Sequence, residues 1–205
     1  MAGDFFDERA ATWDEDPSRV ERARAAAQAI RTAVPLAPST RLLEYGAGTA
    51  MTSQVLADDV GDITLAEPSS GMRAVLADKI AGGVLPATTR VWDLDLASAA
   101  APDEQFDLIV TVMTLHHIPD LDAVLKGFAT LLPAGGHLCI VDLQSEDGSF
   151  HSNDPNFEGH HGFEQDSLTA RLRAAGFSVP AWQHIHQIDK NGVTYPLFLA
   201  VSARA

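Results

Sequence analysis

The sequence has one cysteine and few positive charges. Cys139 lies in the apolar run 138–141 and has no second cysteine to pair with, so we expect a small buried core residue. Acidic residues outnumber basic ones by 28 to 14, which gives a net charge of −14. A surface this negative repels nucleic-acid phosphates and anionic lipid headgroups. We therefore expect neither a nucleic acid nor a membrane among the partners.

Long hydrophobic runs are also absent. No apolar run approaches the roughly 20 residues that span a bilayer, and residues 1–17 are acidic, without the apolar core of a signal peptide. We therefore expect a cytoplasmic protein. The 205 residues are 46% hydrophobic and contain no linker-like stretch, and a chain of this length buries roughly 70% of its unfolded surface as one unit. We expect a single domain over residues 1–205.

What the chain does have is an alternation of short apolar segments with amphipathic ones. The pattern predicts strands at 41–45, 62–68, 89–96, 106–113 and 135–143, and helices at 18–34, 52–58, 71–80 and 120–132. Ser18 and Glu21 have capping-box spacing at the start of the first helix. Strands that alternate with helices in this way favour an α/β fold, in which helices cover both faces of a parallel sheet.

The alternation ends after residue 143. Residues 144–162 are polar and aperiodic, so we expect a long loop of the kind that often forms a lid. A helix is predicted at 166–175, followed by strands at 181–188 and 193–201. Asn191 and Gly192 between these strands indicate a tight hairpin. Pro196 cannot donate a hydrogen bond within a sheet, so it should lie at a strand start, an edge or a bulge.

The strongest indication of a site follows the first predicted strand. Gly46 and Gly48 let the backbone approach a ligand closely, and Glu67 ends the next strand, 19 residues after Gly48. Open α/β sheets bind ligands at the carboxyl ends of their strands, where an acidic side chain accepts ribose hydroxyls. The sequence therefore predicts a site for a nucleoside-containing cofactor, although a tight turn beside a surface glutamate is the alternative.

Two residues disfavour a dinucleotide at this site. Met51 stands where the dinucleotide fingerprint has its third glycine, and the carboxylate of Glu44 would repel phosphate groups. An acidic pocket suits a positively charged ligand without phosphate. A nicotinamide-dependent oxidoreductase is therefore the less favoured alternative for an enzyme.

Together these segments resemble the class I S-adenosylmethionine-dependent methyltransferases, especially small bacterial ones that act on small molecules. Residues 44–49 resemble the family's glycine-rich first motif, and residues 67–72 its second. Residues 106–110 with 115–117 resemble the segment beside the methionine end of the cofactor, 131–136 the turn before strand five, and 6–17 a lid. The resemblance implies a doubly wound, Rossmann-like, mostly parallel seven-stranded sheet with an antiparallel C-terminal strand.

The same resemblance divides the chain by role. Residues 1–37 would form the N-terminal lid segment and helix, 38–143 the cofactor-binding core, and 144–205 the substrate-side loop, helix and hairpin. It implies that S-adenosylmethionine is bound by Glu44, Gly46, Ala47, Gly48, Glu67, Pro68, Met72, Asp93, Leu94 and Thr111. Glu67 would hold the ribose, Met72 would lie against the adenine, and Asp93 would contact its amino group. The Asn/Asp-Pro-Pro-aromatic motif of amino-methylating nucleic-acid enzymes is absent.

Histidines are the candidates for proton transfer. Methyl transfer from a sulfonium mainly requires alignment of the nucleophile with the methyl group, and a general base is needed only if the nucleophile must lose a proton. His117, after the fourth strand, is the candidate base, and His116 is the less favoured neighbour. His160 and His161 in the long loop are substrate-side candidates. A non-catalytic protein that senses the cofactor is a further alternative, which these polar groups disfavour.

A metal site is not expected from the pattern. His184 and His186 lie on one face of a predicted strand and could be joined by His151 or Asp154, but no third ligand has a defined spacing. We therefore expect a methyltransferase that uses S-adenosylmethionine and a small-molecule substrate, without a metal ion.

Overall fold

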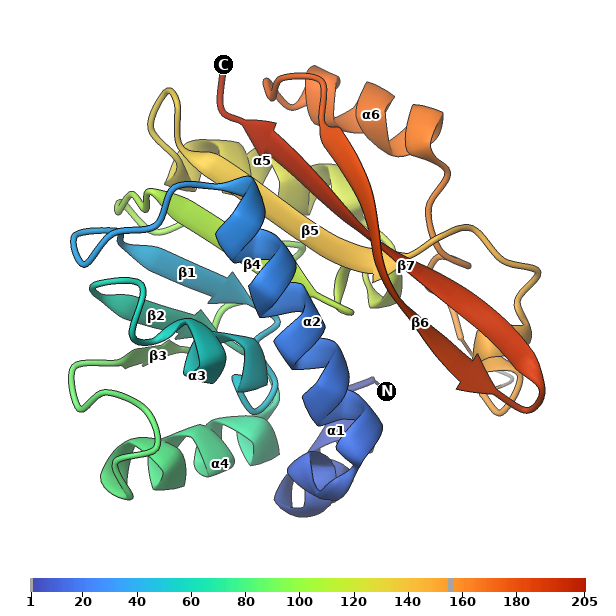
Figure 1. Ribbon diagram of the computed structural model, residues 1–205, viewed down its shortest axis with the longest axis horizontal. Coiled ribbons are helices and arrows are strands. Elements are labelled where there is room, and N and C mark those ends of the chain that lie inside the picture. Colours follow the sequence, from blue (N-terminus) through green and yellow to red (C-terminus); the bar gives the residue numbers. More distant parts are fainter. Residues whose placement is uncertain (1, 155–156) are drawn as a thin grey trace.

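A seven-stranded sheet runs through the molecule, in the order β3-β2-β1-β4-β5-β7-β6 (Figure 1). The structure is a computed structural model, and it describes residues 2–154 and 157–205. The strands are β1 Leu42–Tyr45, β2 Ile63–Ala66, β3 Arg90–Trp92, β4 Leu108–Val112, β5 His137–Leu143, β6 Ala181–Lys190 and β7 Val193–Ala203. β1 to β5 pair in parallel, and β7 pairs antiparallel with both β5 and β6. The predicted doubly wound, mostly parallel sheet is confirmed.

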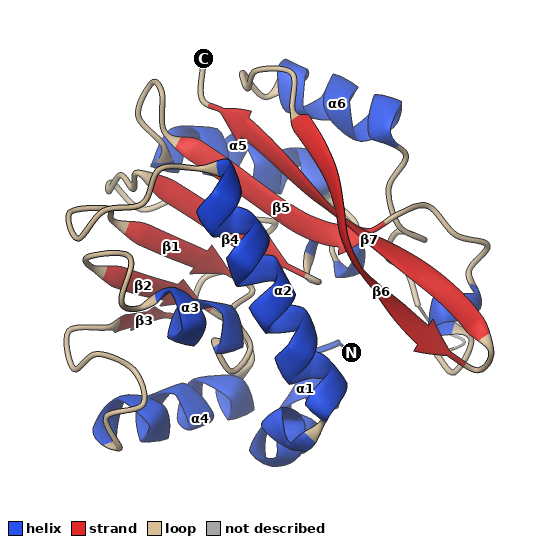
Figure 2. Cartoon of the chain, viewed as in Figure 1, coloured by secondary structure: helices blue, strands red, loops and turns tan. Residues whose placement is uncertain are grey.

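Helices cover both faces of this sheet (Figure 2). They are α1 Ala2–Arg9, α2 Pro17–Ala33, α3 Met51–Leu56, α4 Ser70–Ala81, α5 Leu121–Leu131 and α6 Gln165–Ala174, with short 3-10 helices η1 Ala10–Glu15, η2 Leu115–His117 and η3 Ser149–His151. Neighbouring residues of a strand point to opposite faces: Leu42 packs with α2, α3 and α4, whereas Leu43 packs with α5 and α6. No helix in the described part of the chain is both long and apolar enough to cross a bilayer.

The start of α2 differs from the predicted capping box. Asp16, not Ser18, is the N-cap: its carboxylate accepts a hydrogen bond from the backbone N–H of Ser18 at 2.9 Å. Pro17 takes the first helical position, where its missing N–H costs nothing because that donor would have no partner within the helix. The prediction was wrong because aspartate caps as well as serine does, and Pro17 fixes the helix start one residue earlier.

The C-terminal hairpin places Pro196 where it interrupts no ladder. Asn191 and Gly192 both have left-handed backbones, with φ of 54° and 78°, as the tight hairpin turn requires. The carbonyl of Pro196 accepts the N–H of Gln144 at 3.0 Å, so the side of Pro196 that lacks a donor faces β5. β5 makes its last paired contact one residue along, at Leu197. The proline therefore lies near the strand start, as expected.

Candidate functional site

A cavity of about 420 Å³ opens at the carboxyl ends of β1, β2 and β4. The strand order reverses between β1 and β4, and open α/β sheets bind ligands at such switch points. Residues 44–49, 67–69 and 112–114 line the cavity from the strand ends. Phe6 from α1, Trp13 from η1, and Arg19 and Arg22 from α2 also line it. The cavity thus joins the sheet to the N-terminal segment.

The glycine loop after β1 is shaped by its two glycines in different ways. Gly46 and Gly48 both have left-handed backbones, with φ of 66° and 55°. A Cβ on Gly46 would come within 2.1 Å of the Thr114 side chain, whereas a Cβ on Gly48 would meet nothing within 4 Å. Gly48 lines the cavity. Packing therefore requires glycine at position 46, and a side chain at position 48 would take up space that a ligand can use.

Glu67 is a buried acceptor held in place by backbone donors. Its carboxylate accepts the N–H of Gly48 and the N–H of Ser69, each at 2.8 Å. Burial raises the pKa of Glu67, and the two backbone hydrogen bonds oppose that rise. A carboxylate offers about four lone-pair positions, so two remain for hydroxyl groups of a ligand.

Glu44 lies deeper, at the base of the same wall. Its side chain is buried and accepts the N–H of Ser53 at 3.0 Å, which ties β1 to α3. Burial raises the pKa of Glu44 to about 7, and the hydrogen bond to Ser53 and the nearby charge of Lys79 partly offset this. The carboxylate therefore changes its charge near neutral pH.

The structure brings together most of the predicted cofactor residues but not all of them. The cavity wall includes Glu44, Gly46, Ala47, Gly48, Glu67, Pro68 and Met72. Three others lie outside the wall. The Asp93 side chain is 69% exposed and pairs with Arg73 at 3.0 Å, Leu94 is buried in the core beneath α5, and Thr111 is buried within β4.

Asp95 takes the place in the wall that was predicted for Asp93. Its carboxylate accepts the N–H of Ala97 at 2.9 Å and lies 3.3 Å from the hydroxyl of Tyr45. The sequence here reads Asp-Leu-Asp-Leu, so both aspartates have the same local pattern. β3 ends at Trp92 and the turn begins at Leu96, so both aspartates lie in the extended segment between them, and no sequence signal distinguishes the two.

Of the histidines, only His117 lies in the cavity wall. Burial lowers the pKa of His117 well below its ordinary value, and neighbouring His116 and His151 lower it further. The substrate-side candidates lie elsewhere: Nε2 of His160 is 3.0 Å from the carbonyl oxygen of Ile118, and the side chain of His161 is 52% exposed beside Glu146. His184 and His186 lie on β6, outside the wall.

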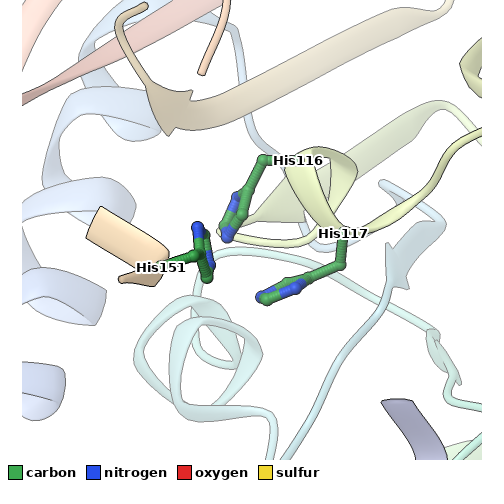
Figure 3. A group of neighbouring side chains, drawn as sticks. All are labelled: His116, His117 and His151. Carbon is green, nitrogen blue, oxygen red and sulfur yellow. The ribbon is translucent and has the colours of Figure 1, made fainter. Parts of the chain in front are cut away.

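His151 lies against His116 and His117, as Figure 3 shows, and of these three His117 lines the cavity. Residues of the long loop were expected near the substrate, but His151 was considered only as a partner of His184 and His186. The structure instead places it against the two histidines that follow β4, with ring centroids 5.2 Å from each. No spacing rule links residues 116 and 151, because only the packing of η3 brings them together.

The N-terminal segment forms hydrogen bonds with both the loop after β1 and the loop after β2. The Asp7 carboxylate accepts the hydroxyl of Ser69 at 2.5 Å and the N–H of Gly71 at 2.8 Å, at the start of α4. The Asp14 carboxylate accepts the hydroxyl of Thr49 at 2.5 Å and pairs with Lys79 at 2.5 Å. These contacts place Phe6 and Trp13 in the cavity wall. No motif in the sequence indicates a role for Asp7 or Asp14.

Arg22 presents a positive charge to the cavity. Arg22 is half-buried in the wall, and its guanidinium has neither a hydrogen bond nor an ion pair among the residues that the structure describes. Burial, with a smaller effect of the neighbouring charge of Arg19, lowers the pKa of Arg22 to about 10, although the charges of Asp16 and Asp142 act in the opposite direction. A guanidinium binds carboxylates in a two-pronged geometry, so Arg22 is suited to a carboxylate ligand.

The sequence is similar to those of known methyltransferases. Residues 18–181 match the protein family described as "Methyltransferase domain". The uncharacterized methyltransferase YrrT of Bacillus subtilis is 25% identical over 194 residues, covering 85% of this chain and 89% of that protein. Other curated relatives are matched over about half of their length or less.

Two solved structures show how widely the fold is shared. The DhpI–SAH complex is 23% identical, with a TM-score of 0.73 over 98% of this chain and 93% of that one. A chain from the complex of the Haloferax volcanii Trm112 methyltransferase activator with a methyltransferase is 15% identical, with a TM-score of 0.78 over 97% of each chain. At these identities the likeness concerns the fold alone.

Proposed function

The chain belongs to the methyltransferase-domain family, and from this premise we propose that it methylates a small molecule held in the cavity at the carboxyl ends of β1, β2 and β4. Membership of the family supports the class of reaction, which is an S-adenosylmethionine-dependent methyl transfer. The cavity supports the choice of acceptor: its volume of about 420 Å³ lies within the roughly 300–1,000 Å³ typical of small-molecule sites.

The residues of the wall fit S-adenosylmethionine. When bound, this cofactor supplies a methyl group activated on a sulfonium. Glu67 would accept the ribose hydroxyls with the lone pairs that its backbone donors leave free. Met72 and Asp95 would lie at the adenine, and the open space above Gly48 would hold the methionine portion. Asp95 thus replaces Asp93 in the assignment.

We assign Arg22 to the carboxylate of the cofactor's methionine portion. Arg22 is the cavity-lining guanidinium for which the described residues provide no partner, and the cofactor carries one carboxylate. A charge-assisted pair of this kind is roughly twice as strong as a neutral hydrogen bond. Arg22 would therefore fix the end of the cofactor next to the methyl group.

A small acceptor suits the charge of the molecule better than a nucleic acid does. The chain carries a net charge of −14, and Glu44, Glu67 and Asp95 add acidic groups to the wall itself. Phosphate backbones would be repelled. The prediction of a cytoplasmic protein stays a prediction.

The test is a screen for release of S-adenosylhomocysteine. Wild type and the Glu67→Ala variant are offered sets of hydroxyl, thiol, amine and carboxylate compounds, with transfer RNA as a separate arm. The expected result is turnover by wild type with a small compound, and strongly reduced turnover by the variant at a subsaturating concentration of the cofactor. Turnover with RNA alone would overturn the proposed acceptor class, and cofactor binding without turnover on any compound would favour a sensor protein.

A further inference from the structure

Three histidines from two separate segments meet at the edge of the cavity (Figure 3). His116 and His117 lie in η2, directly after β4, and His151 lies in η3, after β5. One ligand nitrogen from each lies within 4.8 Å of the other two. The rings of His116 and His117 are 4.1 Å apart between centroids, so the three side chains share one small space.

Two nitrogens in this space have no hydrogen-bond partner among the described residues. His116 is 1% exposed, and its Nδ1 lies 2.5 Å from Oδ1 of the buried Asp142. Nδ1 therefore donates to the carboxylate, and Nε2 carries the lone pair with no partner. Nδ1 of His151 is likewise buried and without a partner. A buried polar atom left unsatisfied costs about 1–3 kcal/mol, so two in one place indicate a ligand.

The donor set selects the kind of ligand. Imidazole nitrogens suit zinc, copper, iron and nickel, and a carboxylate that accepts the other ring N–H is the usual outer partner of a metal-binding histidine. Asp142 holds His116 in that way, and it also accepts the N–H of Leu143 at 2.8 Å. Three histidines with one further position open are the ligand set of a catalytic zinc site.

We propose that His116, His117 and His151 form a site for a divalent transition-metal ion, with an open position that faces the cavity beside His117. Tetrahedral zinc, with Zn–N distances of about 2.0–2.1 Å, holds its nitrogens roughly 3.3 Å apart. The present separations of up to 4.8 Å would have to close by small rotations of the side chains, and the ring of His151, half-buried on the short η3, would have to slide over the face of Phe157.

The surroundings of the cluster would keep water away from such an ion. Phe157 stacks on His151 with 3.7 Å between ring centroids. Phe6 meets the edge of His117 at 5.4 Å, and Phe150 meets His116 at 6.3 Å. Among the charged groups that act on the cluster, Asp142 beside His116 would offset the charge of the ion. At His151, Asp154 would also favour the ion, whereas Lys190 would oppose it. An apolar shell strengthens the interaction of an ion with a bound acceptor.

The open position suggests which acceptor atom is methylated, an inference that rests on the proposed function. A hydroxyl or thiol that bound there would give up its proton to water as it entered, before the aromatic shell closed, and would keep a lone pair for attack. An amine would spend its single lone pair on the ion. The acceptor oxygen or sulfur then bonds to the methyl carbon as the carbon–sulfonium bond breaks, the electron pair stays on sulfur, and S-adenosylhomocysteine leaves. We infer that the acceptor is a hydroxyl or thiol compound.

The site is tested with zinc alone. Chelator-stripped wild type, dialysed against buffered Zn²⁺ and measured by elemental analysis, should bind one ion. His151→Gln should bind at least 10-fold more weakly, and Asp142→Asn about 10- to 100-fold more weakly because the outer partner is lost. His161→Gln is the matched control, since that exposed histidine lies outside the cluster, and it should bind as wild type does.

Calorimetry with S-adenosylhomocysteine on the same preparations separates the possible failures. If wild type binds zinc no better than His151→Gln while both bind S-adenosylhomocysteine normally, the metal site is overturned and the proposed function stands. If zinc binds as expected but no compound is methylated, the proposed function fails and the site stands. Methylation of amines that is insensitive to stripping would overturn the acceptor inference.

Discussion

Gly46 and Gly48 share a left-handed backbone but differ in their surroundings, and this difference can be tested. A Cβ in this conformation costs roughly 1–2 kcal/mol, so Gly48→Ala should lower the free energy of unfolding by about that amount. Gly46→Ala should lower the free energy of unfolding by about 1–3 kcal/mol more than Gly48→Ala does, because its Cβ would overlap Thr114. Urea unfolding measures both effects.

Cofactor affinity should distinguish the same two variants. Gly48→Ala, and still more Gly48→Val, should lose S-adenosylhomocysteine binding out of proportion to their stability, because the added side chain enters the cavity. A Gly48→Val protein that binds S-adenosylhomocysteine like wild type would place the cofactor elsewhere.

Glu67 and Asp93 form a second matched pair. Glu67→Ala should weaken S-adenosylhomocysteine binding by about 1–3 kcal/mol, roughly 5- to 150-fold, since a charged acceptor is lost and the Gly48 N–H loses its partner. Asp93→Ala should leave the affinity within about twofold, because that side chain is exposed and points to Arg73. Calorimetry that finds the reverse order would restore Asp93 to the site.

The pKa of Glu44 predicts a pH dependence of stability. Its folded-state pKa of about 7 lies above the ordinary glutamate value of 4.5, so the folded state binds the proton more tightly. The contribution to stability is full below pH 4.5 and is lost as the pH rises through 7. Between pH 5 and 8 the wild type should lose about 2–3 kcal/mol relative to Glu44→Gln. Parallel pH curves of unfolding free energy would contradict a neutral buried Glu44.

Residue-level sequence reasoning located residues of the cavity wall where a motif fixes the backbone. Gly46, Gly48 and Glu67 follow directly from the strand ends, and all three line the cavity. It failed at the repeated Asp-Leu pair, where only the folded structure shows which aspartate lines the cavity. Arg22 carried no signal either, because an arginine on a helix is usually in solvent.

Among the elements, α1 has no apolar period in its sequence but makes specific polar contacts with the start of α4. Asp7 caps the start of α4 through Ser69 and Gly71, and a Cβ on Gly71 would come within 2.8 Å of the Asp7 backbone. Asp7→Ala should therefore speed amide hydrogen exchange across residues 2–15 and weaken S-adenosylhomocysteine binding. Glu8→Ala, on the same helix, is the control. Equal exchange in both variants would mean that α1 is held by its apolar contacts instead.

Strands were easier to predict than helix ends. β4 and β5 are nearly continuous apolar runs, buried on both faces, and such runs stand out in any sequence. The caps of α2 depend on a choice between Asp16 and Ser18 that only geometry makes. α1 was expected as a lid segment and not as a helix, because its acidic sequence has no apolar period.

At the scale of the molecule, two segments distant in sequence flank the cavity. We expect residues 4–16 and 144–162 to be mobile without ligand and ordered with it; Pro155 and Asn156 lie outside the described residues. Phe6 already touches His117, and His151 stacks on Phe157, so closure of both segments would exclude water from the methyl group. Hydrogen exchange should show slower exchange in both segments when S-adenosylhomocysteine is added. Unchanged exchange would indicate a preformed pocket.

The overall topology followed from the sequence because the alternation of strands and helices leaves few arrangements for a parallel sheet. The meeting of His116, His117 and His151 did not follow, because it depends on how a loop after β5 packs against the segment after β4. The composition alone predicts an acidic protein. That Glu44, Glu67 and Asp95 surround one cavity could be seen only in the folded structure.

The position of β7 has a consequence for synthesis. β7 follows every other strand in the chain, yet it lies between β5 and β6 and is the strand with which β6 pairs. A nascent chain on the ribosome therefore exposes the open edge of β5, with its apolar residues from Leu138 to Leu143, until residue 203 has emerged. Unpaired edges of this kind attract other strands. Completion of the sheet must await translation of its last strand, so the growing chain depends on rapid closure or on chaperones to stay unaggregated.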